Sequence, residues 1–273
     1  LFFQHYPDSA VWGPMHWGHA VSKDLVSWEE LEIALYPDSL GYIFSGSAVA
    51  DTRNTSGFGK VGQTPVVAIF TYHNMEAEKA GAPDSQSQGL AYSLDGGNNW
   101  TKYENNPVLK SPGLKDFRDP KVIWNKKRHQ WVMTLATYEK TLFYASKDLK
   151  SWTFLSDFGK NYGAHGGVWE CPDLFPIKVE GAEEEKWVLL QSLNPGGANG
   201  GSGTQYFVGD FDGKKFVLDP KFETQLKKGP QWVDHGRDNY AGVTWSGIPE
   251  KDGRRIFIGW MSNWDYANKV PTK

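Results

Sequence analysis

The sequence has only one cysteine, Cys171, among its 273 residues. A single cysteine excludes an internal disulfide framework and fits a reducing compartment, although many secreted enzymes also lack disulfides. Long apolar runs are missing too, since no stretch approaches the length of a membrane span or carries the flanks of a signal peptide. The sequence therefore predicts no membrane partner and leaves the cellular location open.

Charge of one sign is equally scarce. The 29 basic and 32 acidic residues give a formal net charge of −3, and the basic residues are scattered along the chain. Nucleic-acid-binding domains concentrate positive charge on one face, so no nucleic acid is expected as a partner. His16 and His19 have a spacing close to that of metal ligands, but no cysteine or second histidine pair completes a site. We therefore expect neither a metal nor another cofactor.

Patterns typical of helices are nearly absent. Short runs rich in Val, Ile, Phe, Tyr and Trp alternate with Gly, Asn, Asp and Pro, as in strands and turns. The sequence predicts an all-β protein with one domain over residues 1–273, because β-barrels and propellers of this length are routinely single domains. Its 13 Trp, 12 Tyr and 15 Phe suit both a large core and stacking on sugars. Strands are predicted at residues 65–72, 89–94, 120–124, 130–138, 141–146, 186–193, 204–211 and 255–261.

One hairpin pattern recurs: an apolar strand, then Ser, any residue, Asp, a short turn and Trp. It occurs in AVSKDLVSWEEL (20–31), AYSLDGGNNWTKY (91–103) and YASKDLKSWTFL (144–155), with a weaker copy in FVGDFDGKKFVL (207–218). We expect the Asp to accept turn N–H groups and the Trp to re-enter the core. The spacing matches four-stranded propeller blades, whereas a β-sandwich does not explain a recurring hairpin. The pattern favours a propeller of four to five blades.

Two acidic residues stand outside the turns. Asp119 follows Arg118 in FRDPKV (117–122), and the arginine is expected to keep this carboxylate ionised for charge stabilisation or hydroxyl binding. The alternative is a structural ion pair at a strand end. Glu170 lies among apolar residues in VWECPDLF (168–175), which is expected to raise its pKa and make it a proton donor. Here the alternative is a strand residue that faces solvent.

Two further stretches leave their roles open. DHGRDNYAG (234–242) places Asp234 and Asp238 around Arg237, where they could bind sugar hydroxyls or pin a loop. The Gly-rich NPGGANGGSGTQ (194–205) lacks the Gly-Lys-Ser/Thr ending of a phosphate loop. We expect it to pass close to the pocket or to another segment. No Gly-x-Ser-x-Gly pattern supports a nucleophilic serine.

Together the motifs resemble glycoside hydrolase family 32, the β-fructofuranosidases, which include invertases, inulinases and levanases. The resemblance covers essentially the whole chain, and its motifs occur in the expected order. They are LFFQHYP (1–7), WGPMHWGHAVSKDLVSWEEL (12–31), ALYPD (34–38), IFSGSAV (43–49), TSGFG (55–59), FRDPKV (117–122), WECPDLF (169–175), NPGGANGGSGTQYFVGDFDG (194–213), DHGRDNYAGVTW (234–245) and GWMSNWDYANKVPT (259–272).

The resemblance implies a five-bladed β-propeller that cleaves β-fructofuranosidic bonds, in sucrose or in fructans such as inulin and levan, with retention of configuration. Matched by motif, Glu170 is the general acid/base and Asp119 is the transition-state stabiliser. The sugar is the expected partner, and the resemblance implies no cofactor. The residues that match the substrate-binding positions are Arg118, Gln4, Trp12, Phe44, Ser45 and Trp264.

The sequence departs from the family pattern at both ends. The family's nucleophile is the Asp of a Trp-Met-Asn-Asp-Pro-Asn-Gly motif one hairpin before the FFQ strand, and no Asp-Pro pair in this chain replaces it. The family's C-terminal β-sandwich is unmatched as well. We therefore expect an incomplete first blade whose open edge favours self-association, and no useful hydrolysis by these residues alone. The alternatives are a non-catalytic propeller that binds fructan or sucrose, and a fructosyltransferase.

Overall fold

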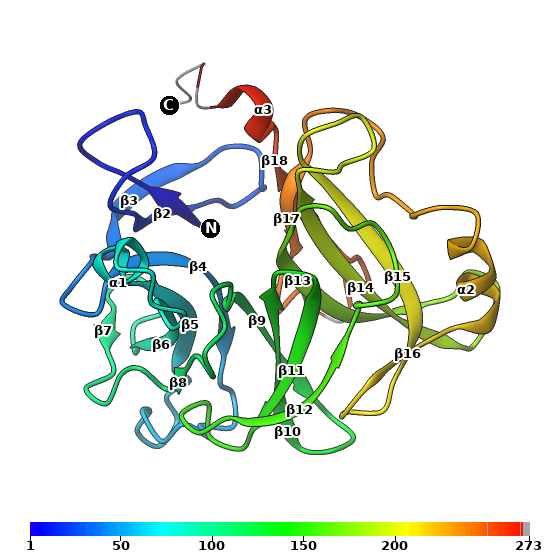
Figure 1. The fold of residues 1–273 in the computed structure, drawn as a ribbon. Helices are drawn as coiled ribbons and strands as arrows, with labels where there is room; N and C mark the ends of the chain where they lie inside the picture. Colours follow the sequence, from blue (N-terminus) through cyan, green and yellow to red (C-terminus); the bar gives the residue numbers. More distant parts are fainter. Residues whose placement is uncertain (250, 268, 270–273) are drawn as a thin grey trace.

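The chain folds into antiparallel β-sheets arranged around a centre like the blades of a propeller (Figure 1). This computed structural model describes residues 1–249, 251–267 and 269, so the motif that begins at Gly259 ends outside the described residues. The all-β propeller predicted from the sequence is confirmed at this level.

The strands group into sheets in chain order, and each predicted strand overlaps an observed one. The first sheet holds β1 (Phe2–His5), β2 (His16–Val21) and β3 (Glu29–Leu35), and the second holds β4 (Tyr42–Ala50), β5 (Val66–His73) and β6 (Gln86–Ser93), with β7 (Thr101–Lys102) and β8 (Leu109–Lys110) both paired to β6. The third is β9 (Arg118–Asn125), β10 (Gln130–Thr137), β11 (Lys140–Ser146) and β12 (Thr153–Phe158). The fourth is β13 (Val168–Lys178), β14 (Glu185–Asn194), β15 (Gly203–Phe211) and β16 (Phe216–Leu218), and the last is β17 (Tyr240–Thr244) with β18 (Phe257–Trp260).

Among the residues that the structure describes, three short helices accompany the sheets: α1 (Met75–Lys79), α2 (Pro220–Leu226) and α3 (Trp264–Ala267). Their shortness explains why no helical periodicity stands out in the sequence. Two of them have a start signal in the sequence. Asn74 caps α1 by accepting the N–H of Ala77, and Asp219 caps α2 by accepting the N–H groups of Lys221 and Phe222, with proline at the first helical position.

The predicted Asp hairpin is present in all four copies. In each copy one carboxylate oxygen accepts two consecutive turn N–H groups, which lowers the pKa of that Asp below its ordinary value. The donors are Val26 and Ser27 for Asp24, Asn98 and Asn99 for Asp95, Lys150 and Ser151 for Asp148, and Lys214 and Lys215 for Asp212.

The hairpins also align the sheets with one another. In the second to fourth sheets this hairpin joins the third strand to the fourth, namely β6 to β7, β11 to β12 and β15 to β16. In the first sheet it joins β2 to β3. By this hairpin, strands β1, β2 and β3 align with the second, third and fourth strands of the other sheets, and no described strand pairs with the other edge of β1.

The tryptophans of the hairpins do not all behave as predicted. Trp100 packs against the apolar core between the first and second sheets and Trp152 against that between the second and third, and each donates its indole N–H to a turn carbonyl. Trp28 differs, because it is 36 % exposed and its ring stacks on Trp245 at 6.0 Å with an angle of 14°. Residue 245 directly follows β17, so this pair joins the first sheet to the last where the propeller closes. That contact is invisible to a local sequence pattern.

The first strand in each of the last four sheets, here called the innermost strand, carries a β-bulge. The register shifts place two residues opposite one at positions 44–45 in β4, 119–120 in β9, 171–172 in β13 and 241–242 in β17. The first bulge residue is left-handed in three of them, with φ of 62° at Asp119, 50° at Cys171 and 53° at Ala241. The sequence predicted Pro120 at the first position of its strand. Instead, Pro120 lies in the bulge, as the third residue of β9. Strand β9 packs beside β4 and β13, and β13 packs beside β17.

Candidate active site

Glu170 is the centre of a polar cluster built by three sheets. It immediately precedes the bulge of β13. Its Oε1 accepts from Arg118, at 3.3 Å from Nε and 3.1 Å from Nη2, and its Oε2 accepts from the hydroxyl of Tyr240. Tyr240 is 2 % exposed, and burial together with the Glu170 charge raises its pKa well above the ordinary value. Tyr240 therefore remains a hydrogen-bond donor, and the carboxylate of Glu170 is held in one orientation.

The surroundings of Glu170 are polar, which corrects the expected apolar environment. The side chain is 23 % exposed and contacts a guanidinium and a phenol from residues 52 and 70 positions away. Its neighbour Trp169 is fully buried in the core on the opposite side of the strand. Because successive strand residues point to opposite faces, the apolar neighbours in the sequence do not surround the carboxylate.

Asp119 lies beside this cluster, at the equivalent bulge of β9. It is 8 % exposed, and its Oδ2 accepts the backbone N–H of Cys171 at 3.0 Å. Burial raises the pKa of Asp119 to about 6, against the opposing effect of Arg118. Arg118 acts in the expected direction, but burial outweighs it, so Asp119 is ionised only above a pH of about 6. The guanidinium donates to Asp116 and Glu170, and burial of Asp119 outweighs its attraction.

The predicted pocket residues of the first two sheets form a second group. Phe44 and Ser45 make the bulge of β4. Trp12, in the loop after β1, is 46 % exposed and lies edge-to-face to Phe44 at 6.2 Å between ring centroids. Gln4 donates from Nε2 to a backbone carbonyl of β4 at 3.1 Å. These four residues, which are up to 41 positions apart in the sequence, thus meet on one side of the site.

Polar residues of the second sheet tie this group to Asp119. Thr71 is the single residue opposite the β4 bulge, and its Oγ1 accepts the backbone N–H of Asp119 at 3.1 Å. The same hydroxyl donates to Gln88, whose Nε2 donates to the carbonyl of Phe117 at 2.8 Å. A buried hydrogen-bond network therefore joins the strand opposite the β4 bulge to the backbone of Phe117 and Asp119.

Trp264 lies on the other side of the site. It begins α3, and its ring is 5.0 Å from that of Trp260, which pairs with Tyr240 across β17 and β18. Its backbone N–H donates to Ser202 at 3.1 Å. Trp264 is thus linked to Glu170 through Trp260 and Tyr240, while the other predicted aromatic residues lie with β4.

A buried ion pair crosses the innermost strands of the last three sheets. Lys121 Nζ is 3.5 Å from Asp173 Oδ2, and both side chains are almost fully buried. Thr244 of β17 joins them, because its carbonyl accepts from Lys121 and its N–H donates to Asp173 at 2.5 Å. Both charged residues lie two or three positions after the catalytic candidates of their strands. The pair fixes the spacing of β9, β13 and β17 and thereby the approach of Tyr240 to Glu170.

Sequence reasoning missed the roles of Tyr240, Asp116 and Thr71. Tyr240 directly precedes the bulge of β17, as Glu170 precedes that of β13. This shared position is a signal, but the bulges become visible only in the strand registers. Asp116 and Thr71 contact Arg118 and the backbone of Asp119 across turns and between sheets.

The two stretches whose roles were open both make structural contacts. Asp234 accepts the N–H of Gly236 at 2.5 Å, and Arg237 donates to Asp265 at 2.6 Å, with these side chains exposed. These contacts pin the loop, which is the second of the two roles considered for this stretch. The Gly-rich stretch passes against α3, where a Cβ on Gly201 would lie 2.2 Å from Asn263 Oδ1.

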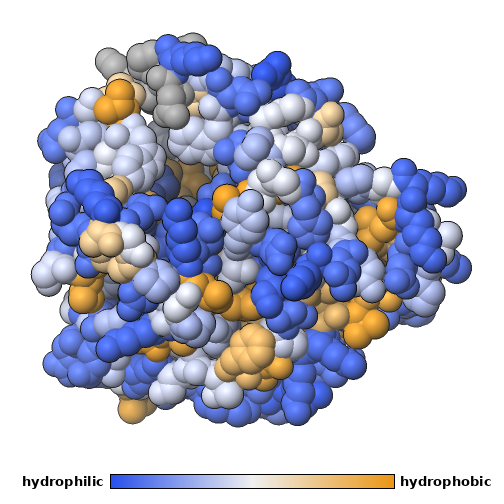
Figure 2. All heavy atoms as spheres, viewed as in Figure 1, coloured by the Kyte–Doolittle hydropathy of each residue, from blue (hydrophilic) through white to orange (hydrophobic). Residues whose placement is uncertain are grey.

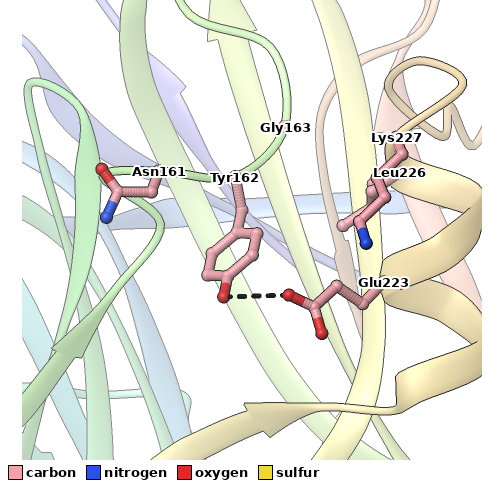
Figure 3. Close-up of a pocket in the computed structure, with 6 residues that line it drawn as sticks. All are labelled: Asn161, Tyr162, Gly163, Glu223, Leu226 and Lys227. Carbon is pink, nitrogen blue, oxygen red and sulfur yellow. Dashed lines mark hydrogen bonds between the residues drawn. The ribbon is translucent and has the colours of Figure 1, made fainter.

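A surface cleft of about 310 Å³ lies apart from these residues, between the loop after β12 and α2 (Figure 3). Tyr162 points across it and donates to Glu223 Oε1 at 3.3 Å. The cleft is lined by Asn161, Tyr162, Gly163, Glu223, Leu226 and Lys227.

The face of the molecule seen in Figure 2 is mostly hydrophilic, with hydrophobic side chains in small separate groups.

Within the described part of the chain, no group of three or more His, Cys, Asp or Glu is arranged to hold a metal ion. None of its helices has the length and apolarity needed to cross a membrane.

The model of the glycosyl hydrolases family 32 N-terminal domain matches residues 1–273. The chain belongs to this family. The levanase of Bacillus subtilis (strain 168) is 56% identical over 273 residues, which are 100% of this chain and 38% of the levanase. An extracellular exo-inulinase of Aspergillus ficuum is 45% identical over 293 aligned positions that cover 100% of this chain and 54% of the inulinase. The family 32 chain thus spans about half, or less, of the length of these relatives.

Solved structures show the same relationship. The exo-inulinase from Aspergillus awamori superimposes with a TM-score of 0.87 at 41% identity, over 99% of this chain and 56% of that one. The fructofuranosidase from Schwanniomyces occidentalis complexed with fructose also gives 0.87, at 42% identity, over 99% and 50%. The resemblance to family 32 inferred from the motifs is confirmed, and the relatives of this family 32 chain are glycosidases of fructans and fructofuranosides.

Proposed function

We propose that this chain supplies the acid/base and the transition-state stabiliser of a β-fructofuranosidase site that acts on sucrose or fructans with retention of configuration. One observation carries the proposal. Glu170 and Asp119, from separate motifs, lie at equivalent bulges of neighbouring inner strands, where Asp119 accepts the N–H of the residue after Glu170. A relative with this fold was solved with fructose bound.

Each carboxylate has a role that fits its contacts. Glu170, oriented by Arg118 and Tyr240, would protonate the oxygen of the leaving group and later deprotonate water. Asp119 would bind fructosyl hydroxyls and stabilise the oxocarbenium-like transition state, and it is charged above its pKa of about 6. We assign Arg118 to the same sugar contacts, since it directly precedes Asp119 in the sequence and donates to Glu170 in the cluster.

The remaining pocket residues would shape the fructose-binding wall. Trp12 and Phe44 offer ring surfaces against which a sugar can stack, and Gln4 and Ser45 offer polar groups beside them. Trp264 would contact the sugar from the side of Tyr240.

We further propose that residues 1–273 form one domain and that each sheet is a blade, so that the propeller has five. Strands β1 to β3 then complete three of the four positions of the first blade, and the open edge of β1 would pair with a second copy. Light scattering on the purified chain tests this, with a dimer expected and a monomer at high concentration contradicting it.

The chemistry also predicts what residues 1–273 would do by themselves. A retaining reaction needs a nucleophile opposite the acid, and no residue here matches the nucleophile motif of the family. A polypeptide of these residues would therefore bind the fructosyl group without turning it over.

The test measures binding and turnover separately. Calorimetry with fructose should give binding to the chain, retention of binding in Glu170→Gln, and a loss of about tenfold or more in Asp119→Asn, because hydrogen bonds to a charged group are lost. Asp157→Asn, an exposed residue in β12, is the matched control and should bind normally.

Turnover is followed with sucrose, inulin and levan. No fructose binding, or normal binding by Asp119→Asn, would refute the site assignment. Release of fructose at the rate of full-length relatives would refute the predicted lack of turnover, and transfer products would identify a fructosyltransferase.

A further inference from the structure

His73 occupies a buried position behind the aromatic wall of the proposed pocket. It ends β5 and is 3 % exposed. Its ring stacks face to face on Phe44, with 4.3 Å between centroids and an angle of 7°, and the ring of Tyr42 lies 6.4 Å away. Phe44 cannot shift toward the interior while this imidazole is in place. His73 lies outside the motifs that carry the family resemblance.

The hydrogen bonds of Gln86 determine which nitrogen of His73 carries the proton. Gln86 Oε1 accepts the backbone N–H of Phe117 at 2.8 Å, so its NH₂ group points the other way. That NH₂ lies 3.3 Å from His73 Nδ1. An amide NH₂ can only donate, so Nδ1 accepts and the ring proton is on Nε2. The arrangement therefore requires a neutral imidazole.

Two charged groups face this imidazole from other elements. Glu78 of α1 places Oε2 at 3.0 Å from Nε2, and its side chain is 40 % exposed. Arg118 of β9 acts on the ring from the interior. Burial lowers the pKa of His73 below its ordinary range, with Glu78 acting to raise it and Arg118 acting to lower it. The neutral form is thus the one present near neutral pH.

We propose that neutral His73 is a positioning residue for sugar binding, because it supports Phe44 with its ring and holds Gln86 against the backbone that leads into Arg118. The proposal rests on the proposed function, in which Phe44 and Arg118 contact the fructosyl group. His73 would connect the two walls of the pocket, since Phe44 belongs to β4 and Arg118 to β9.

Protonation would break this connection. A proton on Nδ1 would face the NH₂ of Gln86, and two donors cannot bond to each other. The side-chain amide of Gln86 would have to turn over. Its NH₂ would then face the backbone N–H of Phe117, and the hydrogen bond from Phe117 to Gln86 would be lost as well. Sugar binding should therefore weaken as the pH falls through the pKa of His73, in addition to the effect of protonating Asp119.

The experiment measures fructose affinity by calorimetry at about pH 7.5 and at about pH 4, well below the ordinary pKa of histidine, because burial lowers the pKa of His73. His73→Ala should weaken binding about tenfold at the higher pH, because the ring contact and the Gln86 bond are both lost. His73→Phe refills the space and keeps the stack, so it should lose about threefold or less. His129→Asn, at an exposed histidine in the β9–β10 turn, is the matched control and should equal the unmodified chain.

The pH series separates a positioning role from a merely structural one. The affinity of the unmodified chain should fall more between the two pH values than that of His73→Phe, by about threefold or more, since both share Asp119 and differ only in His73. Equal pH dependence in the two would overturn the inference, as would normal binding by His73→Ala. If the unmodified chain does not bind fructose at all, the proposed function fails instead. If His73→Ala does not fold, the comparison with His73→Phe still decides.

Discussion

Removing the carboxylate of Asp148 tests whether the repeated hairpin stabilises the fold. Its Oδ1 accepts the N–H groups of Lys150 at 2.9 Å and Ser151 at 2.8 Å, and the hydroxyl of Ser146 at 3.0 Å. In Asp148→Ala both N–H groups lose a charged acceptor. A hydrogen bond to a charged group contributes about 1.5–3 kcal/mol, but this half-buried turn admits water, so the loss resembles that of a helix cap. We expect Asp148→Ala to lower the free energy of unfolding by about 2 kcal/mol.

Thermal and urea unfolding give the measurement. For 273 residues, a loss of about 2 kcal/mol corresponds to a fall in Tm of about 3–4 °C. Asp148→Asn keeps an acceptor without the charge and should lose about half as much. The matched control is Asp157→Ala, whose exposed pair with Lys140 at 2.9 Å should cost about 0–1 kcal/mol.

The pH dependence has a defined sign. At Asp148 burial acts to raise the pKa, but the hydrogen bonds from Ser151 and Lys150 outweigh it, and the folded pKa lies below the unfolded one. The stabilisation is therefore complete above the unfolded pKa of about 4 and fades as the pH falls through the folded pKa. The difference between the unmodified chain and Asp148→Ala should shrink in acid. A loss no greater than that of Asp157→Ala at neutral pH would refute the role assigned to the hairpin.

Three further predictions concern the interior and the closure of the propeller. Cys171 is partly exposed, but burial and the charges of nearby carboxylates raise its pKa well above the ordinary value, so an aromatic disulfide reagent at mildly alkaline pH should label the native chain much more slowly than the unfolded chain; equal labelling rates would contradict this. Trp28→Ala removes the stack on Trp245 and should lower the free energy of unfolding by about 1–2 kcal/mol, measured as a lower urea midpoint. An unchanged midpoint would show that the stack does not hold the first and last sheets together. Lys121→Met leaves the carboxylate of Asp173 buried and unpaired and should cost about 3–5 kcal/mol, whereas the double variant with Asp173→Leu should recover much of the loss; additive losses would disprove the pairing.

Local patterns predicted the strands, the hairpins and the two carboxylates. Alternating apolar residues and turn residues act over a few positions, so the strand assignments hold along β5, β10 and β14. The Ser-x-Asp hairpin is local too, because Asp148 bonds to N–H groups only two and three residues away. The same local logic failed for Glu170, whose sequence neighbours are apolar but whose spatial neighbours are not.

The sequence by itself therefore determined the all-β class, the repeated hairpin and the family, since these depend on residue type and short spacing. Only the tertiary structure decided which groups surround each carboxylate. Tyr240 reaches Glu170 from 70 residues away, and Trp28 meets Trp245 only because the sheets close into a ring. Likewise burial, which no tripeptide reveals, raises the pKa of Asp119 to about 6 although Arg118 precedes it. Packing between sheets sets solvent access and charge proximity, and these quantities govern the chemistry of the site.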